Sequence, residues 1–344
     1  MALRRSSSGL LAPHGMTALV AVAAALAAGA LVGLAWTVGF GAVLHRLIHP
    51  HWFWLWIAIA GEAVAYVGYT AAYREVATAE DGAELRVPLA AALVSTGFGV
   101  FVHSGGFALD RIALERAGLS ATEARRRVLG LGALEYAVLA PATLVAAVVV
   151  VFFHPGVSSG LTFPWIIGVP AGTALALTAL HWRTVVTRWP LIGKRLEHGL
   201  HALQLVLRLV TSPLRYGLGV VGAVAYWAGD IFCLWAALHA FSAHTPPVAQ
   251  LIVGYSTGYA ITRRALPLGG AGVVEALLPF ALGWVGIALA PALLAVFAYR
   301  LINLWLPIVP ALGGIPALRR LEEDSRTRRS GKRTRDTHRT GRIR

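Results

Sequence analysis

The sequence predicts an all-α integral membrane protein with about six full transmembrane helices and two re-entrant helical hairpins, arranged as an inverted repeat. Of its 344 residues, 57% are hydrophobic and 13% are charged, about half the charged fraction of an ordinary soluble domain. The mean hydropathy is +0.67. Several apolar stretches also reach the length of about 20 residues that a helix needs to cross a bilayer. The lipid bilayer is therefore the solvent that this composition fits.

Six stretches have the length and composition of membrane spans. The first is preceded by Arg4 and Arg5, but its apolar core is too long for a signal peptide, so we expect a retained helix. Residues 17–318 then form one transmembrane domain, between a cytoplasmic N-terminus (1–16) and a basic, disordered cytoplasmic tail (319–344). The predicted spans are Thr17–Phe40, His51–Tyr73, Val128–Phe153, Phe163–His181, Leu214–Phe241 and Leu289–Leu312.

The net charge of +14 is concentrated at the C-terminus. The tail Arg319–Arg344 holds eleven Lys and Arg residues against four acids, which is half of that net charge. A basic segment just beyond the last span is expected from positive-inside topology and from attraction to anionic lipids. We therefore expect anionic lipids, and not nucleic acid, as partners of the tail. The single Cys233 excludes an intramolecular disulfide and a thiolate metal cluster, and we expect neither metal nor cofactor.

The charges of the loops set the orientation and require re-entrant segments. Arg183–Arg215 carries six Lys and Arg residues and Asp110–Arg127 carries five, so both are expected in the cytoplasm. If Val87–Leu109 crossed the membrane, the basic loop Asp110–Arg127 would lie outside the cell. We expect instead that Val87–Leu109 enters from the cytoplasm and turns back, and that Val248–Ile287 does the same from outside. Both termini of this multi-pass protein of the cell membrane are then cytoplasmic.

The two re-entrant segments carry matching motifs in the same order. An inverted repeat explains the match, with halves at about 10–153 and 160–318. In the first half STGF (Ser95–Phe98) precedes SGG (Ser104–Gly106) and Asp110, and in the second STGY (Ser256–Tyr259) precedes LGG (Leu268–Gly270) and Glu275.

The segment before the tail carries a more specific pattern. Pro267, Gly269, Gly270, Gly272 and Glu275 form a P-x-G-G-x-G-x-x-E motif, and apolar residues then lead to Arg300 and a final helix rich in Trp, Leu and Pro. This pattern resembles the flippase-like transmembrane domain of lysylphosphatidylglycerol synthases and their stand-alone relatives.

The first half is also similar to that family, over Gly105–Arg127, although His103 and Ser104 depart from the family's Pro and acid. Because no aminoacyl-transfer domain follows Leu318 in this sequence, the resemblance implies lipid handling without lipid aminoacylation.

Charged residues and glycines at membrane depth are the candidates for a substrate-binding site. A charged side chain at the bilayer centre costs about 2.5–3.5 kcal/mol on insertion scales. Arg263 and Arg264 near the second hairpin tip therefore indicate a wet cavity or an anionic partner, or else a shallow hairpin from which both side chains reach the interface. Gly269 and Gly270 can adopt positive φ and let the backbone approach a ligand. The half-helix beginning near Gly272 would point its amides at a phosphate or carboxylate.

The intramembrane acids and Arg300 complete the predicted site. Glu275 either caps the half-helix, joins a structural ion pair or binds a headgroup. Arg300 and Glu135 lie at equivalent places in the two halves, and each is a candidate partner of the other or of a zwitterionic substrate. Glu62 and Asp230 fall in the middle of the second span of each half, where each is either a proton relay or substrate ligand, or part of a helix–helix hydrogen bond. We expect all these charges to line one polar cavity.

The favoured function is translocation of a lipid or a lipid-linked polar headgroup, so a phospholipid or lipid-linked molecule is the expected partner. Two alternatives stay open: a membrane enzyme of lipid-linked glycosyl or aminoacyl transfer, and a small-solute secondary transporter. No Ser-His-Asp order or P-loop stands out, so no catalytic residue is assigned and a transporter is favoured over an enzyme. A homo-oligomer remains open as well.

Overall fold

The computed structural model describes residues 13–78, 92–93, 96–97, 107–154, 156–183, 193–241, 245–260, 270–307, 311–314, 316 and 320. Within these ranges the chain forms helices and no strand, as the sequence predicts. The elements are α2 (Pro13–Val38), α3 (Phe40–Ile48), α4 (Trp52–Thr78), α6 (Phe107–Arg116), α7 (Ala121–Phe153), α8 (Ser159–His181), α10 (Gly193–Thr211), α11 (Pro213–Phe241), α12 (Val248–Tyr255), the π-helical turn η1 (Ser256–Ala260), α13 (Val273–Trp284), α14 (Leu289–Arg300) and the π-helical turn η3 (Leu301–Trp305).

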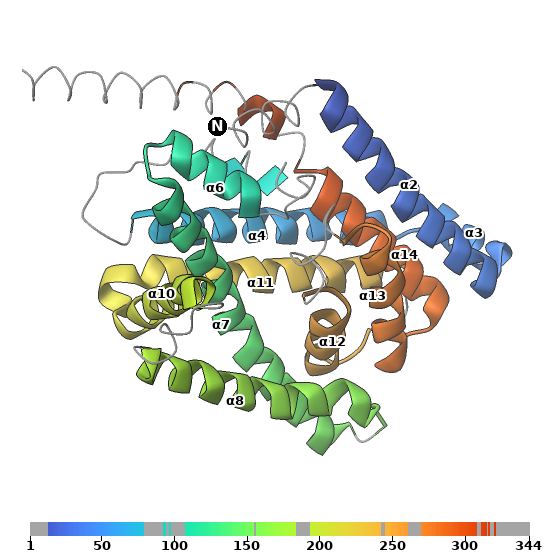
Figure 1. The fold of residues 1–344 in the computed structure, drawn as a ribbon. Coiled ribbons are helices and arrows are strands. Elements are labelled where there is room, and N and C mark those ends of the chain that lie inside the picture. The colour runs from blue at the N-terminus through green and yellow to red at the C-terminus, as the bar shows by residue number, and fades with distance from the viewer. Residues whose placement is uncertain are drawn as a thin grey trace, which may run out of the picture.

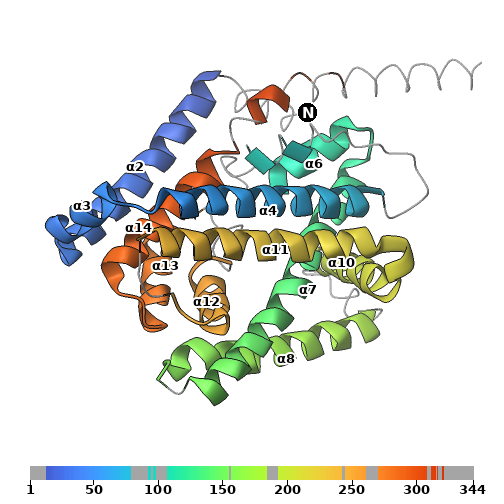
Figure 2. The same ribbon diagram turned by 180° about the vertical axis from the view of Figure 1, so that it is seen from behind.

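The centre of the molecule is the antiparallel pair α4 and α11, which run side by side in both ribbon views (Figures 1 and 2). Glycines bring the two backbones together. A Cβ atom added at Gly68 would lie 2.5 Å from the backbone nitrogen of Tyr226 and 2.6 Å from the carbonyl oxygen of Gly222. Small residues at such contacts are a usual means of packing membrane helices.

The other helices surround this pair. Helix α7 crosses it obliquely and continues to α8, which lies along one edge of the molecule (Figure 1). Helices α12, α13 and α14 cover the end of the pair opposite to α10, and α2 packs against α13 and α14 from outside (Figure 2). The buried core is continuous across α4, α7, α11 and α14.

Four of the six predicted spans are helices long and apolar enough to cross a membrane. They are Trp52–Thr78, Ala121–Phe153, Ser159–His181 and Tyr216–Phe241. Their ends differ from the predicted ones by a few residues. The largest shift is at the start of α7, where Ser120 caps the helix by accepting from the Glu123 amide at 3.2 Å. The chain is thus a membrane protein with membrane-embedded helices.

The first and last predicted spans differ more. The first begins as the 26-residue α2, but Gly39 at φ 97° ends that helix, and α3 forms where the sequence predicted a loop over Gly41–Pro50. The last is described as an apolar helix over Leu289–Leu304, in which α14 ends at Arg300 and η3 follows. Residues 308–310 lie outside the described residues, and 311–314 are again helical.

Several predicted features lie outside the described residues. These are the two termini (1–12 and 321–344), the first hairpin turn Ser104–Gly106, the pair Arg263 and Arg264, and Gly269. The inverted repeat and the re-entrant path of the chain therefore stay predictions at this point.

Candidate functional site

A cluster of buried polar side chains lies between α4, α11, α12, α13, α14 and the two π-helical turns. At its centre is Asp230 of α11, which has no exposed surface. Its Oδ2 accepts a hydrogen bond from the Tyr255 hydroxyl, and its Oδ1 accepts from the Tyr299 hydroxyl at 2.9 Å. Buried carboxylates are stable when several donors surround them, so these tyrosines hold Asp230 in place.

Asn303 of η3 joins Asp230 to the second acid of the cluster, Glu62 of α4. Its Nδ2 donates to Glu62 Oε1 at 2.9 Å and to Asp230 Oδ1 at 2.7 Å. Its Oδ1 accepts from the Tyr259 hydroxyl at 2.8 Å, and its backbone carbonyl accepts from the Tyr66 hydroxyl at 3.1 Å. One amide side chain therefore connects α4, α11 and η1, which fixes its orientation.

Three residues earlier on the same helix, Arg300 forms a buried ion pair with Glu275 of α13. Its Nε donates to Glu275 Oε1 at 2.8 Å, while Glu275 Oε2 accepts from the Gly272 amide at 2.7 Å. Both predicted structural roles of Glu275, as helix cap and as ion-pair partner, are thus present in one side chain. The expected positive φ is present at Gly270, where φ is 69°, and Gly272 also has a positive φ, of 85°.

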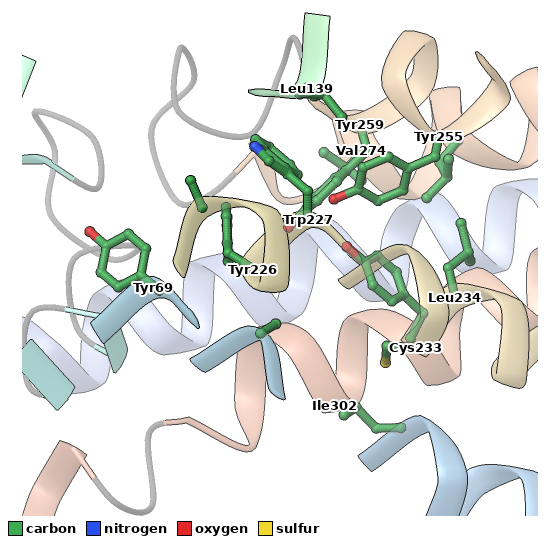
Figure 3. Close-up of a cluster of buried hydrophobic side chains, with 14 of the residues drawn as sticks. Tyr69, Leu139, Tyr226, Trp227, Cys233, Leu234, Tyr255, Tyr259, Val274 and Ile302 are labelled. Carbon is green, nitrogen blue, oxygen red and sulfur yellow. The ribbon is translucent and has the colours of Figure 1, made fainter. Parts of the chain in front are cut away.

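Aromatic rings enclose the charged groups. Trp227 stands edge-on to Tyr255, with ring centroids 6.1 Å apart, and the Tyr255 and Tyr259 rings are tilted against each other with centroids 5.2 Å apart (Figure 3). The Arg300 guanidinium carbon lies 5.6 Å from the centre of the Tyr259 ring. This wall lowers the local dielectric around the acids, so every charge and hydrogen bond in the cluster acts more strongly than it would in water.

The STGY motif of the second half reaches four different elements through its four residues. Ser256 Oγ lies 2.7 Å from Thr143 Oγ1 of α7, and Thr257 Oγ1 accepts from the Trp165 indole of α8 at 3.0 Å. A Cβ atom at Gly258 would lie 2.8 Å from Leu278 Cα of α13. Tyr259 reaches Asn303, as described above. Because η1 is a π-helical turn, its residues point in directions that a regular α-helix would not allow.

Another buried acid, Asp110 of α6, lies away from this cluster along the α4–α11 pair. Its Oδ2 accepts from the Tyr69 hydroxyl at 2.7 Å, and its backbone carbonyl accepts from the Tyr73 hydroxyl at 3.1 Å. Arg127 of α7 lies near this end and donates to Glu123 Oε1 at 2.8 Å. The repeat predicted from the sequence makes Asp110 the equivalent of Glu275 in the first half, but it did not predict that tyrosines bind Asp110.

The predicted site residues divide into three groups. Glu62, Asp230, Glu275 and Arg300 come together in one cluster, with Gly270 just before the α13 N-terminus. Glu135 is buried on α7, where its carbonyl oxygen accepts from the Trp227 indole at 2.8 Å. Arg300, for which Glu135 was a candidate partner, pairs with Glu275. Arg263, Arg264 and Gly269 lie outside the described residues.

Sequence reasoning missed the residues that connect the cluster, namely Tyr66, Tyr255, Tyr299 and Asn303. A signal was present for the last, because an amide side chain inside an apolar span needs a polar partner. The tyrosines gave no such signal, because tyrosine is also common in apolar packing and at membrane interfaces.

A cavity of about 430 Å³ lies beside α4, and none of the cluster's charged residues lines it. It is lined by α4 and by Ala92, Leu93 and Leu218, and its polar lining includes Tyr66, Thr70 and Arg74. Since the Tyr66 hydroxyl bonds to the backbone of Asn303, this cavity reaches the edge of the cluster. Within the described ranges, no three His, Cys, Asp or Glu side chains come together in a way that could hold a metal ion.

Comparison with known proteins bears on the same region. A family model described as the lysylphosphatidylglycerol synthase TM region matches residues 18–311, which confirms the resemblance seen in the sequence. No curated protein matches the chain. The matched range contains every residue of the polar cluster.

Proposed function

We propose that this protein, which belongs to the lysylphosphatidylglycerol synthase TM family, moves a phospholipid or lipid-linked polar headgroup across the membrane. The observation that carries the proposal is the buried cluster of Glu62, Asp230, Glu275, Arg300 and Asn303 inside an apolar helical bundle. Charges at membrane depth are costly, and they mark substrate or ion pathways when they occur.

The charges of the cluster suit a headgroup that carries both signs. Arg300 offers a guanidinium, which binds phosphate well because its donors form a planar fork. Glu62 and Asp230 would attract an amine or hydrogen-bond a sugar. The cavity beside Tyr66 and Arg74 would let water reach the edge of the cluster from the α4 side. A headgroup bound there would exchange its water shell for fixed protein dipoles.

The proposal includes a re-entrant path for the second half. Helices α12 and α13 have 8 and 12 residues and pack against each other, with η1 following the first. Neither reaches the length of about 20 residues that a span needs, so a hairpin that returns to its own side fits them better. The termini would then both be cytoplasmic. Cysteines introduced over Glu115–Ala124 should resist membrane-impermeant reagents in intact cells, and labelling there would contradict this topology.

A dithionite assay in proteoliposomes tests the function directly. A fluorescent phospholipid placed in both leaflets is bleached from outside, and the wild-type protein should expose the inner pool. Asp230→Asn, Arg300→Ala and Glu275→Gln should each slow this by about tenfold or more, a change of about 1.4 kcal/mol in the barrier. Size-exclusion profiles and melting temperatures of each variant separate lost activity from lost fold.

The exposed ion pair of α6 supplies the matched control. Arg111 Nε and Glu115 Oε1 lie 3.3 Å apart at the protein surface, so Arg111→Ala and Glu115→Gln make the same chemical changes outside the cluster. Both should move lipid at the wild-type rate. Equal rates in folded cluster variants and wild type would remove the cluster from the pathway. If wild type moves no lipid under any ion gradient, the enzyme or small-solute reading becomes the better one.

A further inference from the structure

An apolar groove of about 660 Å³ runs between α7, α8 and α10 and ends at η1. Its floor consists of small residues of α7, and its α8 wall carries Gly168 and Gly172 one helical turn apart. Leu207 of α10 lies on the opposite wall. Figures 1 and 2 show α8 at the edge of the molecule, with α10 beside it.

The surroundings of the groove determine what can fill it. Both α7 and α8 are long and apolar enough to cross a membrane, and no residue in the most apolar stretch of α8 is buried by the protein. An apolar groove that opens sideways in a bilayer is filled by hydrocarbon, because water there has no polar partners. Its volume lies within the range of about 300–1,000 Å³ that pockets for single small ligands have. A single acyl chain therefore fits it better than a helix of another protein.

The end of the groove connects it to the polar cluster. Trp165 of α8 and Thr257 of η1 both line the groove, and the indole donates to the Thr257 hydroxyl at 3.0 Å. Two residues beyond Thr257, Tyr259 donates to Asn303 of the cluster. A chain lying in the groove with its ester end at Thr257 would therefore end two residues from Tyr259, which contacts the cluster.

We infer that the groove holds one acyl chain of the transported lipid while its headgroup is bound at the cluster, so that the lipid enters sideways between α8 and α10. This inference rests on the proposed function and makes it more specific. The transported molecule must carry a hydrocarbon chain, and a water-soluble headgroup such as glycerol phosphate should not be moved.

Two glycines allow the groove to be filled without disturbing the fold. A Cβ atom added at Gly168 or Gly172 meets no atom within 4 Å, and both residues line the groove. Gly29 and Gly33 of α2 have the same spacing, are equally open and lie away from the groove. The double variant Gly168→Leu with Gly172→Leu therefore has a matched control in Gly29→Leu with Gly33→Leu.

The probe is phosphatidylglycerol with a photoactivatable diazirine in one acyl chain, mixed into vesicles that contain the full-length protein. Irradiation of wild type should label the α7 floor (Ala133, Ala137 and Ala140), and the groove-filling variant should lose that label. The control variant should keep it. In the dithionite assay the groove-filling variant should be slowed by about tenfold, and the control should match wild type.

Each outcome decides the inference. If lipid-facing residues of α2 and α8 are labelled but the floor is not, the groove does not hold a chain. If the floor is labelled and the groove-filling variant still moves lipid at the wild-type rate, the bound chain is not that of the transported lipid. A change in oligomeric state of that variant would assign the groove to a second copy. If wild type moves no lipid at all, the proposed function fails, and the labelling of wild type still decides whether a chain binds.

Discussion

The α4–α11 pair and helix α8 use glycine in opposite ways. On the α4–α11 contact, glycines bring backbone onto backbone: a Cβ atom at Gly229 would lie 2.6 Å from both the Ala65 nitrogen and the Gly61 oxygen. On α8, Gly168 and Gly172 face open space. Half of the most apolar stretch of α11 is buried, and none of that of α8 is.

The difference shows that two helices of similar hydropathy can have different tasks. Helices α4 and α11 pack with their backbones in contact. Glu62 and Asp230 each follow a glycine of this contact by one residue, and Asn303 bridges the two acids. Helix α8 leaves the space that its glycines create unfilled, which produces the groove. Close packing thus supports the polar cluster, and loose packing leaves room for a hydrophobic ligand.

The largest effect is expected at the packed glycines. Gly68→Leu would force its side chain into the backbone of α11, and we expect a loss of more than about 4 kcal/mol or no folded protein at all. Fluorescence-detected size exclusion and the melting temperature in detergent would measure it. Gly33→Leu, in open space on α2, is the control and should fold normally. A folded Gly68→Leu variant with the wild-type melting temperature would show that the α4–α11 contact is looser than described here.

Arg300→Ala should have the next largest effect, because it leaves the Glu275 carboxylate buried without its cation. Breaking one side of a buried ion pair costs about 3–5 kcal/mol. The double variant Glu275→Gln with Arg300→Met should recover more than half of that loss, since the amide oxygen of Gln can still accept from the Gly272 amide. Melting temperatures of the two variants provide the measurement. A double variant that is less stable than Arg300→Ala would mean that the carboxylate is needed for more than this pair and cap.

Tyr299→Phe should have a smaller effect. It removes one of the donors that surround Asp230 and leaves the ring in place, so we expect a loss of about 1 kcal/mol. Chemical denaturation in mixed micelles can resolve a change of this size. A loss as large as that of Arg300→Ala would indicate that the cluster acts as one cooperative network, in which Tyr255 and Asn303 cannot replace the missing bond.

The smallest effect, with the opposite sign, is expected at the open glycines. Gly168→Ala places a methyl group in free space within a helix, and alanine is more favourable than glycine there by about 0.5–1 kcal/mol. The variant should melt slightly higher than wild type. A lower melting temperature would mean that some element packs on this face of α8, which would contradict both the comparison and the groove.

Much of the candidate site was predictable from the sequence, because the cost of burying charge marks residues one at a time. Glu62, Asp230, Glu275 and Arg300 stand out in apolar surroundings, and all four lie in one cluster. Their pairing was less accessible. The spacing of the two halves made Glu135 a candidate partner for Arg300, whereas the fold gives it Glu275, because α13 and α14 lie side by side and place these two residues at the same end.

Asn303 shows why the connections of the site could not be predicted. Its three side-chain hydrogen bonds go to residues between 44 and 241 positions away in the chain. They also depend on the π-helical turn that follows Arg300, which shifts the direction of every later side chain in that helix. Neither the spacing of residues nor their type predicts this change in side-chain direction.

The sequence by itself determined that the protein is embedded in a membrane, where four of its spans lie, and which charged residues merit attention. It could do so because hydropathy measures the transfer of each residue out of water, whatever surrounds it afterwards. Only the tertiary structure decided that α4 and α11 form the centre, that α8 leaves a groove, and which donor meets which acid. Lipid and protein interior are equally apolar, so the rotation and contact of each helix are set by packing and by hydrogen bonds between distant residues.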